Sequence, residues 1–128
     1  MALKDLIQNT NSTEKDLENI LKSRVKLLKI NDLYSVHIER SFSKTLDQKN
    51  KILFYLAGKL AWQILEKNQI WVKPKELESE LGISGGTIRP SLLAFKKHKF
   101  VEYNKKDKGY RLTGVGLSEL IKFQEELE

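Results

Sequence analysis

Hydrophobic positions recur at two different periods along this chain of 128 residues, and the changes of period mark its predicted elements. Residues 14–23 carry leucine and isoleucine at helical spacing, which predicts a helix. Residues 25–39 alternate apolar and polar side chains and are rich in β-branched and aromatic types, which favours a β-hairpin turning at residues 31–32. A continuation of the preceding helix is the alternative interpretation. Residues 1–8 predict a further short helix.

The longest predicted helix spans residues 49–68 and is apolar on more than one side, as is typical of a helix within a core. The alternative is that half of it faces a partner subunit. At its start, Thr45 and Gln48 match a capping box, and Asp47 is a competing cap. Residues 114–127 predict a final helix with one apolar side.

Residues 69–99 predict a short β segment followed by two helices around a tight turn. The β segment spans residues 69–73, and Pro74 suits the first turn of a helix because no N–H is needed there. Gly82 supplies a left-handed residue after that helix, and Ser84 is expected to cap the next one. Ile83 is expected to hold the turn against the core, and the buried face of the second helix is expected at Ile88, Leu92 and Phe95.

The remaining stretch predicts a β-hairpin with a basic tip. Short strands at 100–103 and 110–112 flank the sequence NKKDKG. Residues 82–113 hold eight basic and two acidic side chains, a net charge of +6, whereas residues 1–81 sum to +3 and residues 114–128 to −3. Such a positive zone is the usual electrostatic footprint of phosphate binding, although a solvated lysine-rich surface is the alternative.

The order of helix, turn, helix and basic hairpin resembles the winged helix-turn-helix superfamily over about residues 49–127. The resemblance implies a mostly α fold with a small antiparallel β wing. Residues 47–128 would form the winged domain, and residues 1–46 an N-terminal extension of helices with the hairpin. In this family the second helix enters the DNA major groove and the wing contacts the backbone. The nucleic-acid-binding residues predicted on this basis are Ser84, Gly85, Gly86, Thr87, Arg89, Ser91, Lys96, Lys97, Lys105, Lys106, Lys108 and Arg111.

Pro90 departs from the family's commonest pattern because it falls inside the expected second helix. Either the regular helix begins near Thr87, with Gly85 and Gly86 in an extended turn, or its first turn is distorted. Both alternatives expose backbone N–H groups that suit a phosphate. Arg89 is the best single candidate for DNA contact, since a guanidinium can pair with guanine or clamp a phosphate.

Other function classes find little support in the chain. It has no cysteine, and its two histidines lie in unrelated segments. No phosphate-binding glycine loop, HExxH motif or ligand cluster is present, so we expect no enzyme, cofactor or metal. No signal peptide or membrane span is predicted, and a cytoplasmic protein is expected.

The leading hypothesis is a double-stranded DNA-binding protein, a small transcription regulator of prokaryotic type. It is expected to act as a homodimer through the helix at 49–68, the helix at 114–127, or both. A protein–protein interaction module is the second hypothesis, because winged helices also dock proteins. RNA binding is the third.

Overall fold

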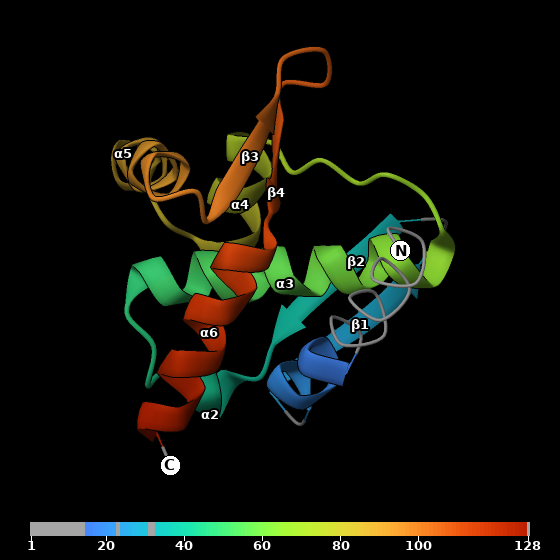
Figure 1. Ribbon diagram of the computed structural model, residues 1–128, viewed down its shortest axis with the longest axis vertical. Helices are drawn as coiled ribbons and strands as arrows, with labels where there is room; N and C mark the ends of the chain where they lie inside the picture. Colours follow the sequence, from blue (N-terminus) through green and yellow to red (C-terminus); the bar gives the residue numbers. More distant parts are fainter. Residues whose placement is uncertain (1–14, 23, 31–32, 128) are drawn as a thin grey trace, which may run out of the picture.

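The computed structural model describes residues 15–22, 24–30 and 33–127. The predicted helix at residues 1–8 and the predicted turn at residues 31–32 lie outside the described residues. Residues 15–21 are helical, as predicted. The elements that follow are β1 (Val25–Ile30), β2 (Leu33–Ile38), α2 (Arg40–Ser43), α3 (Gln48–Glu66), α4 (Pro74–Leu81), α5 (Gly85–Lys97), β3 (Val101–Asn104), β4 (Gly109–Leu112) and α6 (Gly114–Leu127) (Figure 1).

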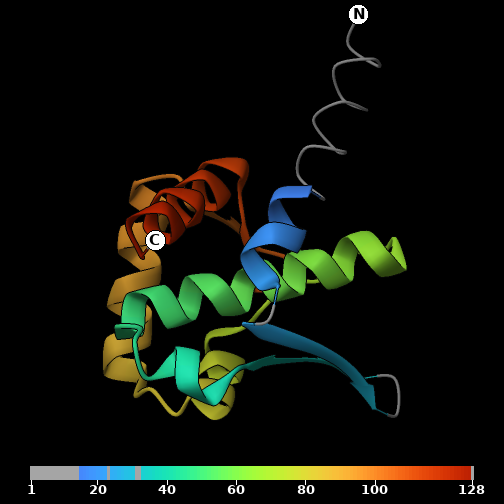
Figure 2. The ribbon, with the colours of Figure 1, turned by 90° about the horizontal axis from the view of Figure 1, so that it is seen from below.

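α3 is the central element, and both hairpins, α4 and α6 pack against it (Figures 1 and 2). Its buried positions lie on every side of the helix, so one apolar stripe would not be enough to cover them. They are Ile52, Leu53, Phe54, Tyr55, Leu56, Ala57, Gly58, Ala61 and Trp62. The interpretation of this helix as a core helix is confirmed.

Asp47 is the residue that caps α3. Its side chain accepts hydrogen bonds from the backbone N–H of Asn50 at 2.9 Å and from the Asn50 side chain at 2.8 Å. The capping-box prediction at Thr45 is wrong, because its hydroxyl instead donates to the Phe42 carbonyl at 2.7 Å. Asp47 stands directly before the first helical residue, which is where a side-chain oxygen reaches the free N–H groups.

β1 and β2 form an antiparallel hairpin that lies along α3 (Figure 2). Val25 pairs with Ile38 and Leu27 with Val36, so these four side chains share the face toward the helix. The hairpin prediction for residues 25–39 is confirmed over the continued helix. The alternation of apolar and polar residues favours the hairpin, because only an extended chain places Val36 and Ile38 on one side.

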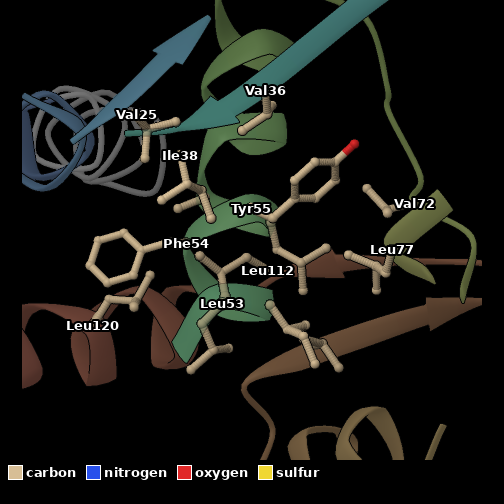
Figure 3. Packing of buried hydrophobic residues seen from close by; sticks show 14 of the residues in the cluster. Val25, Val36, Ile38, Leu53, Phe54, Tyr55, Val72, Leu77, Leu112 and Leu120 are labelled. Atoms are coloured by element: carbon tan, nitrogen blue, oxygen red, sulfur yellow. The ribbon is translucent and has the colours of Figure 1, made fainter. Parts of the chain in front are cut away.

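One hydrophobic cluster runs through the described chain, from Leu17 in the first helical segment to Leu120 in α6. Figure 3 shows Val36 and Ile38 of β2 on one side of α3 and Leu112 and Leu120 on the other. Residues before and after position 47 therefore share a core. The division into a 1–46 extension and a 47–128 domain stays a prediction about folding units.

β3 and β4 form a second, shorter antiparallel hairpin, in which Val101 pairs with Leu112 and Tyr103 with Tyr110. The segment predicted as β at 69–73 contributes a single antiparallel bridge, between Val72 and Tyr110, with N···O distances of 2.9 and 2.7 Å. The predicted pair of strands, its turn and the final helix are confirmed, giving a mostly helical chain with two small hairpins.

None of the helices in the described part of the chain has both the length and the apolarity needed to cross a membrane. α3 is the longest of the described helices, and its nineteen residues include three lysines and a glutamate.

Candidate nucleic-acid interface

α4 and α5 are joined by a tight turn that the sequence predicts correctly. Gly82 adopts φ 65° and ψ 28°, the left-handed region in which a side chain would add strain. Its N–H donates to the Glu78 carbonyl at 3.0 Å and closes the end of α4. Ile83 is only 5% exposed, so its side chain holds the turn against the core. The turn thereby fixes the direction in which α5 leaves α4.

Ser84 occupies the N-cap position of α5 but does not cap the helix with its side chain. Its hydroxyl donates to the Thr87 hydroxyl at 3.4 Å, so the expected cap bond is absent. The Ser84 carbonyl starts the helix instead, accepting from the N–H groups of Thr87 and Ile88 at 3.0 Å each. The first turn is therefore closed by backbone alone.

Pro90 lies inside α5, which begins at Gly85. The interpretation in which the helix starts near Thr87, after an extended Gly85–Gly86 turn, is wrong. A proline in a helix interior costs about 3 kcal/mol because it removes a hydrogen bond and its ring presses on the preceding turn. α5 buries Ile88, Leu92 and Phe95, and each buried apolar side chain contributes about 1.5–3 kcal/mol. The free energy gained by burying these side chains therefore exceeds the cost of the proline.

The two faces of α5 are sharply different. Ile88, Ser91, Leu92 and Phe95 form the buried face. Ser91 was predicted to contact nucleic acid on the assumption that it is exposed. That assumption is wrong, because Ser91 is only 7% exposed. Ser91 is three residues after Ile88, and this spacing returns it to the same side of the helix. The exposed face carries Gly86, Arg89, Pro90, Leu93, Lys96 and Lys97.

The start of α5 already has a carboxylate beside it. An oxygen of Glu78, on α4, lies 2.6 Å from the position that a Cβ on Gly85 would occupy. A guanidinium nitrogen of Arg89 lies 3.4 Å from the same point. A negative side chain at a helix N-terminus is favourable in itself. It also repels a phosphate, so the anchoring corner expected at Gly85, Gly86 and Thr87 is a weaker anion site than the sequence suggests.

The tip of the β3–β4 hairpin is a preorganised turn with exposed lysines. The Asn104 side chain accepts from the backbone N–H groups of Lys106 at 2.9 Å and Asp107 at 3.1 Å. Lys108 adopts φ 53°, which completes the reversal before Gly109. Lys105, Lys106 and Lys108 are all exposed, and none of them forms an ion pair within the described residues.

Arg111 differs from the tip lysines because its charge is already paired. Its guanidinium donates to Glu102, with the Nε–Oε1 contact at 2.7 Å, and stacks over the Trp71 ring at 4.3 Å. A further contact reaches Gln63 on α3 at 3.4 Å. The structure therefore places Arg111 at the base of the hairpin, where it joins β4 to α3 and the chain near Trp71.

Two exposed side chains beside the basic residues were missed by the sequence prediction. Tyr103 is 36% exposed, and the Lys96 ammonium lies 5.3 Å from the centre of its ring. Leu93 is 63% exposed on the outward face of α5. The helical period counted from Ile88 and Leu92 already assigns Leu93 to the outer face. The exposure of Leu93 could therefore have been predicted from the sequence.

Comparison of the chain with protein-family models, curated proteins and solved structures found no match. Within the described residues, no group of three or more histidine, cysteine or acidic side chains is arranged to hold a metal ion. The arrangement of α5 and the β3–β4 hairpin is therefore the basis on which a function can be assigned.

Proposed function

We propose that the chain binds double-stranded DNA as a winged helix-turn-helix protein, with α4 and α5 as the helix-turn-helix and β3–β4 as the wing. Its biological role would be that of a small transcription regulator of prokaryotic type. α5 would lie in the major groove, and the wing would contact the flanking backbone. The bridge between Val72 and Tyr110 supports this assignment, because it adds a third short β segment beside the wing.

The observation that carries the proposal is a set of unpaired cations on two adjacent elements. α5 packs against β3, and the tip of the hairpin projects beside the helix (Figure 1). The exposed cations are Arg89, Lys96, Lys97, Lys105, Lys106 and Lys108. Within the described residues none of these six forms an ion pair, whereas Lys29, Lys59 and Arg111 each pair with a glutamate. Free cations on one surface bind phosphates by releasing the counterions of DNA.

Arg89 and the wing lysines are assigned different roles. Arg89 is exposed near the start of α5, where a guanidinium can pair with guanine in the major groove. Glu78 stands beside it and disfavours a phosphate at the helix start. Lys105, Lys106 and Lys108 are point charges on a turn and suit the backbone. Arg111 is left out of the interface because Glu102 already neutralises it.

Fluorescence anisotropy on a labelled duplex across a salt series tests the proposal. With about five phosphates neutralised, log K is expected to fall with log salt at a slope of about −4.5. A duplex RNA of the same sequence serves as the comparison, because its deep, narrow major groove does not admit side chains. Absence of duplex DNA binding at low salt would reject the proposal.

Arg89→Ala separates base reading from phosphate contact. Loss of one bidentate base contact is expected to weaken a preferred site by about 1–3 kcal/mol, with a much smaller change on random DNA. Lys97→Ala is the matched variant about two turns further along α5 and should weaken binding to both duplexes alike. Equal losses for both duplexes with Arg89→Ala would make Arg89 a phosphate contact.

A homodimer is retained as part of the proposal. α3 is surrounded by its own chain, but Leu65 near its end is 63% exposed, and Val115 at the start of α6 is 52% exposed. In the proposed dimer, a second copy of the chain would contact these exposed aliphatic side chains. Molecular mass in solution tests this, and a monomer at all working concentrations would exclude it.

Binding to another protein is the second candidate, and one hollow favours it. A groove of about 770 Å³ runs between the helical segment 15–21, β1 and the end of α3. Its apolar lining comprises Leu17, Leu21, Val25, Leu27, Ala61, Ile64 and Leu65. A protein partner bound there, together with no affinity for nucleic acid at low salt, would favour this candidate over DNA binding.

A further inference from the structure

The outward face of α5 carries an apolar ridge made of Pro90 and Leu93. The two residues are three positions apart, so they are neighbours on one side of the helix. Both are exposed, and Leu93 is 63% exposed. The core contacts of α5 come from the opposite side, through Ile88, Leu92 and Phe95. The ridge therefore contributes nothing to the core and faces whatever α5 binds.

Cations surround this ridge. Arg89 lies one turn before Leu93, and Lys96 and Lys97 lie one turn after it, all of them exposed. Leu28, Leu33, Leu65 and Val115, the other exposed large aliphatic side chains of the described chain, stand on β1, β2, α3 and α6. Leu93 combines apolar exposure with positive charge one helical turn away in both directions along α5.

The chemistry of a matching surface follows from this arrangement. A matching surface needs an apolar group with negative charge on both sides of it. Each negative charge should lie about one helical turn from the apolar group. The major groove of DNA has this character, because phosphates line both of its edges and the C5-methyl of thymine is the apolar group on its floor. Pro90 also makes the ridge rigid, since its ring fixes the backbone at that position.

The geometry points to thymine methyl recognition by Leu93, with Pro90 completing the contact; this inference rests on the proposed DNA binding. Leu93 is then a specificity-determining residue, and the surrounding cations hold the helix at the depth where its side chain reaches the methyl group. The preferred duplex contains thymine at the position that α5 covers.

Replacing thymine by deoxyuridine tests this inference, because the replacement removes the methyl group and keeps the base pair. Duplexes that the protein enriches from a random pool are made once with each base. The wild-type protein is expected to bind the deoxyuridine duplex about fourfold more weakly for each methyl group contacted. Leu93→Ala should bind both duplexes equally, and Leu93→Met should keep the preference for thymine.

Leu33→Ala is the matched control, because it removes an aliphatic side chain of similar exposure from β2 and should leave the thymine preference unchanged. Thermal unfolding of each variant confirms that it is folded. Wild-type indifference to deoxyuridine, an undiminished preference in Leu93→Ala, or enrichment of duplexes without thymine would each overturn the inference. Salt-dependent duplex binding would then still support the proposed function. Leu93-dependent binding of an acidic, apolar peptide without duplex affinity would overturn both.

Discussion

The two β-hairpins of this protein have the same topology and opposite environments. β1–β2 lies along α3, and β3–β4 projects away from the body of the molecule (Figures 1 and 2). Both are antiparallel pairs and both carry lysines. The local sequence pattern is therefore similar, and what distinguishes the hairpins is what lies beneath each of them.

The first hairpin is bound to α3 by apolar and polar contacts. Val36 packs against Gly58. The Trp62 indole donates to the Ser35 carbonyl at 2.9 Å, and the Lys59 ammonium donates to the Tyr34 carbonyl at 2.6 Å. The bond from the Trp62 indole satisfies a polar group that α3 would otherwise bury unpaired. The lysine on α3 is thus committed to holding the hairpin.

The second hairpin is held along its strands, and its tip is exposed. Val101 and Leu112 are buried, and Gly109 fits closely against Trp71, whereas the lysines between β3 and β4 face solvent. A hairpin held along its strands leaves its tip available to a partner. The comparison teaches that packing, and not strand sequence, separates the structural hairpin from the one proposed to bind.

The largest effect is expected from Gly58→Ala, which disturbs the first hairpin. The added Cβ would lie 2.5 Å from a methyl carbon of Val36, and such overpacking costs about 1–3 kcal/mol. Chemical denaturation should show the lower unfolding free energy. The same change in a Val36→Ala background should be nearly neutral, because the obstructing methyl groups are gone.

Gly86→Ala is the matched change on the exposed face of α5, the helix that packs against the second hairpin. The nearest outside atom to its Cβ position is 3.9 Å away, so no clash arises. Alanine is favoured over glycine in a helix by about 1 kcal/mol, and the unfolding free energy should rise. Equal signs for Gly58→Ala and Gly86→Ala would contradict the difference between the two regions.

A smaller effect, confined to high pH, is expected at Tyr55, which joins α3 to α4 beside the first hairpin. Its hydroxyl donates to Glu76 on α4 at 2.5 Å, and Lys59, which holds β2, lies 2.8 Å from the same oxygen. Burial, followed by the hydrogen bond to Glu76, raises the pKa of Tyr55 above its ordinary value of 10.0.

Because that pKa is raised, the folded protein keeps a proton that the unfolded chain loses above pH 10. The associated stability is present below pH 10 and decreases as the pH rises, by up to about 1.4 kcal/mol per pH unit. Tyr55→Phe should lack this component of the decrease. Parallel curves of unfolding free energy against pH for the two proteins above pH 10 would contradict the assignment.

The smallest effect on stability is expected at the tip of the second hairpin. Replacing Lys105, Lys106 and Lys108 by glutamine should change the unfolding free energy by less than about 0.5 kcal/mol, because the side chains are exposed. The slope of log K against log salt for duplex DNA should become less steep by about 2.7. Lys26→Gln, on the first hairpin, should leave that slope unchanged. A comparable change of the slope for both variants would contradict a specific role of the second hairpin in DNA binding.

Much of the fold could be predicted because its signals are local. Alternation at residues 25–39 depends only on the chain itself, as do the apolar stripe of α3 and the turn residues Pro74 and Gly82. The candidate site was predicted less well. Arg89 and the tip lysines are exposed as expected, but the roles of Ser91 and Arg111 depend on neighbours that are distant in sequence.

The sequence alone determined the order of the elements other than α2, the conformation at Gly82 and the concentration of positive charge in residues 82–113. Periodicity, backbone preference and charge are properties of the chain itself. Only the tertiary structure decided that α5 continues through Pro90, that Glu78 stands at its start and that Arg111 is neutralised. The physical reason is that these outcomes depend on packing energy and on charges brought together from separate elements.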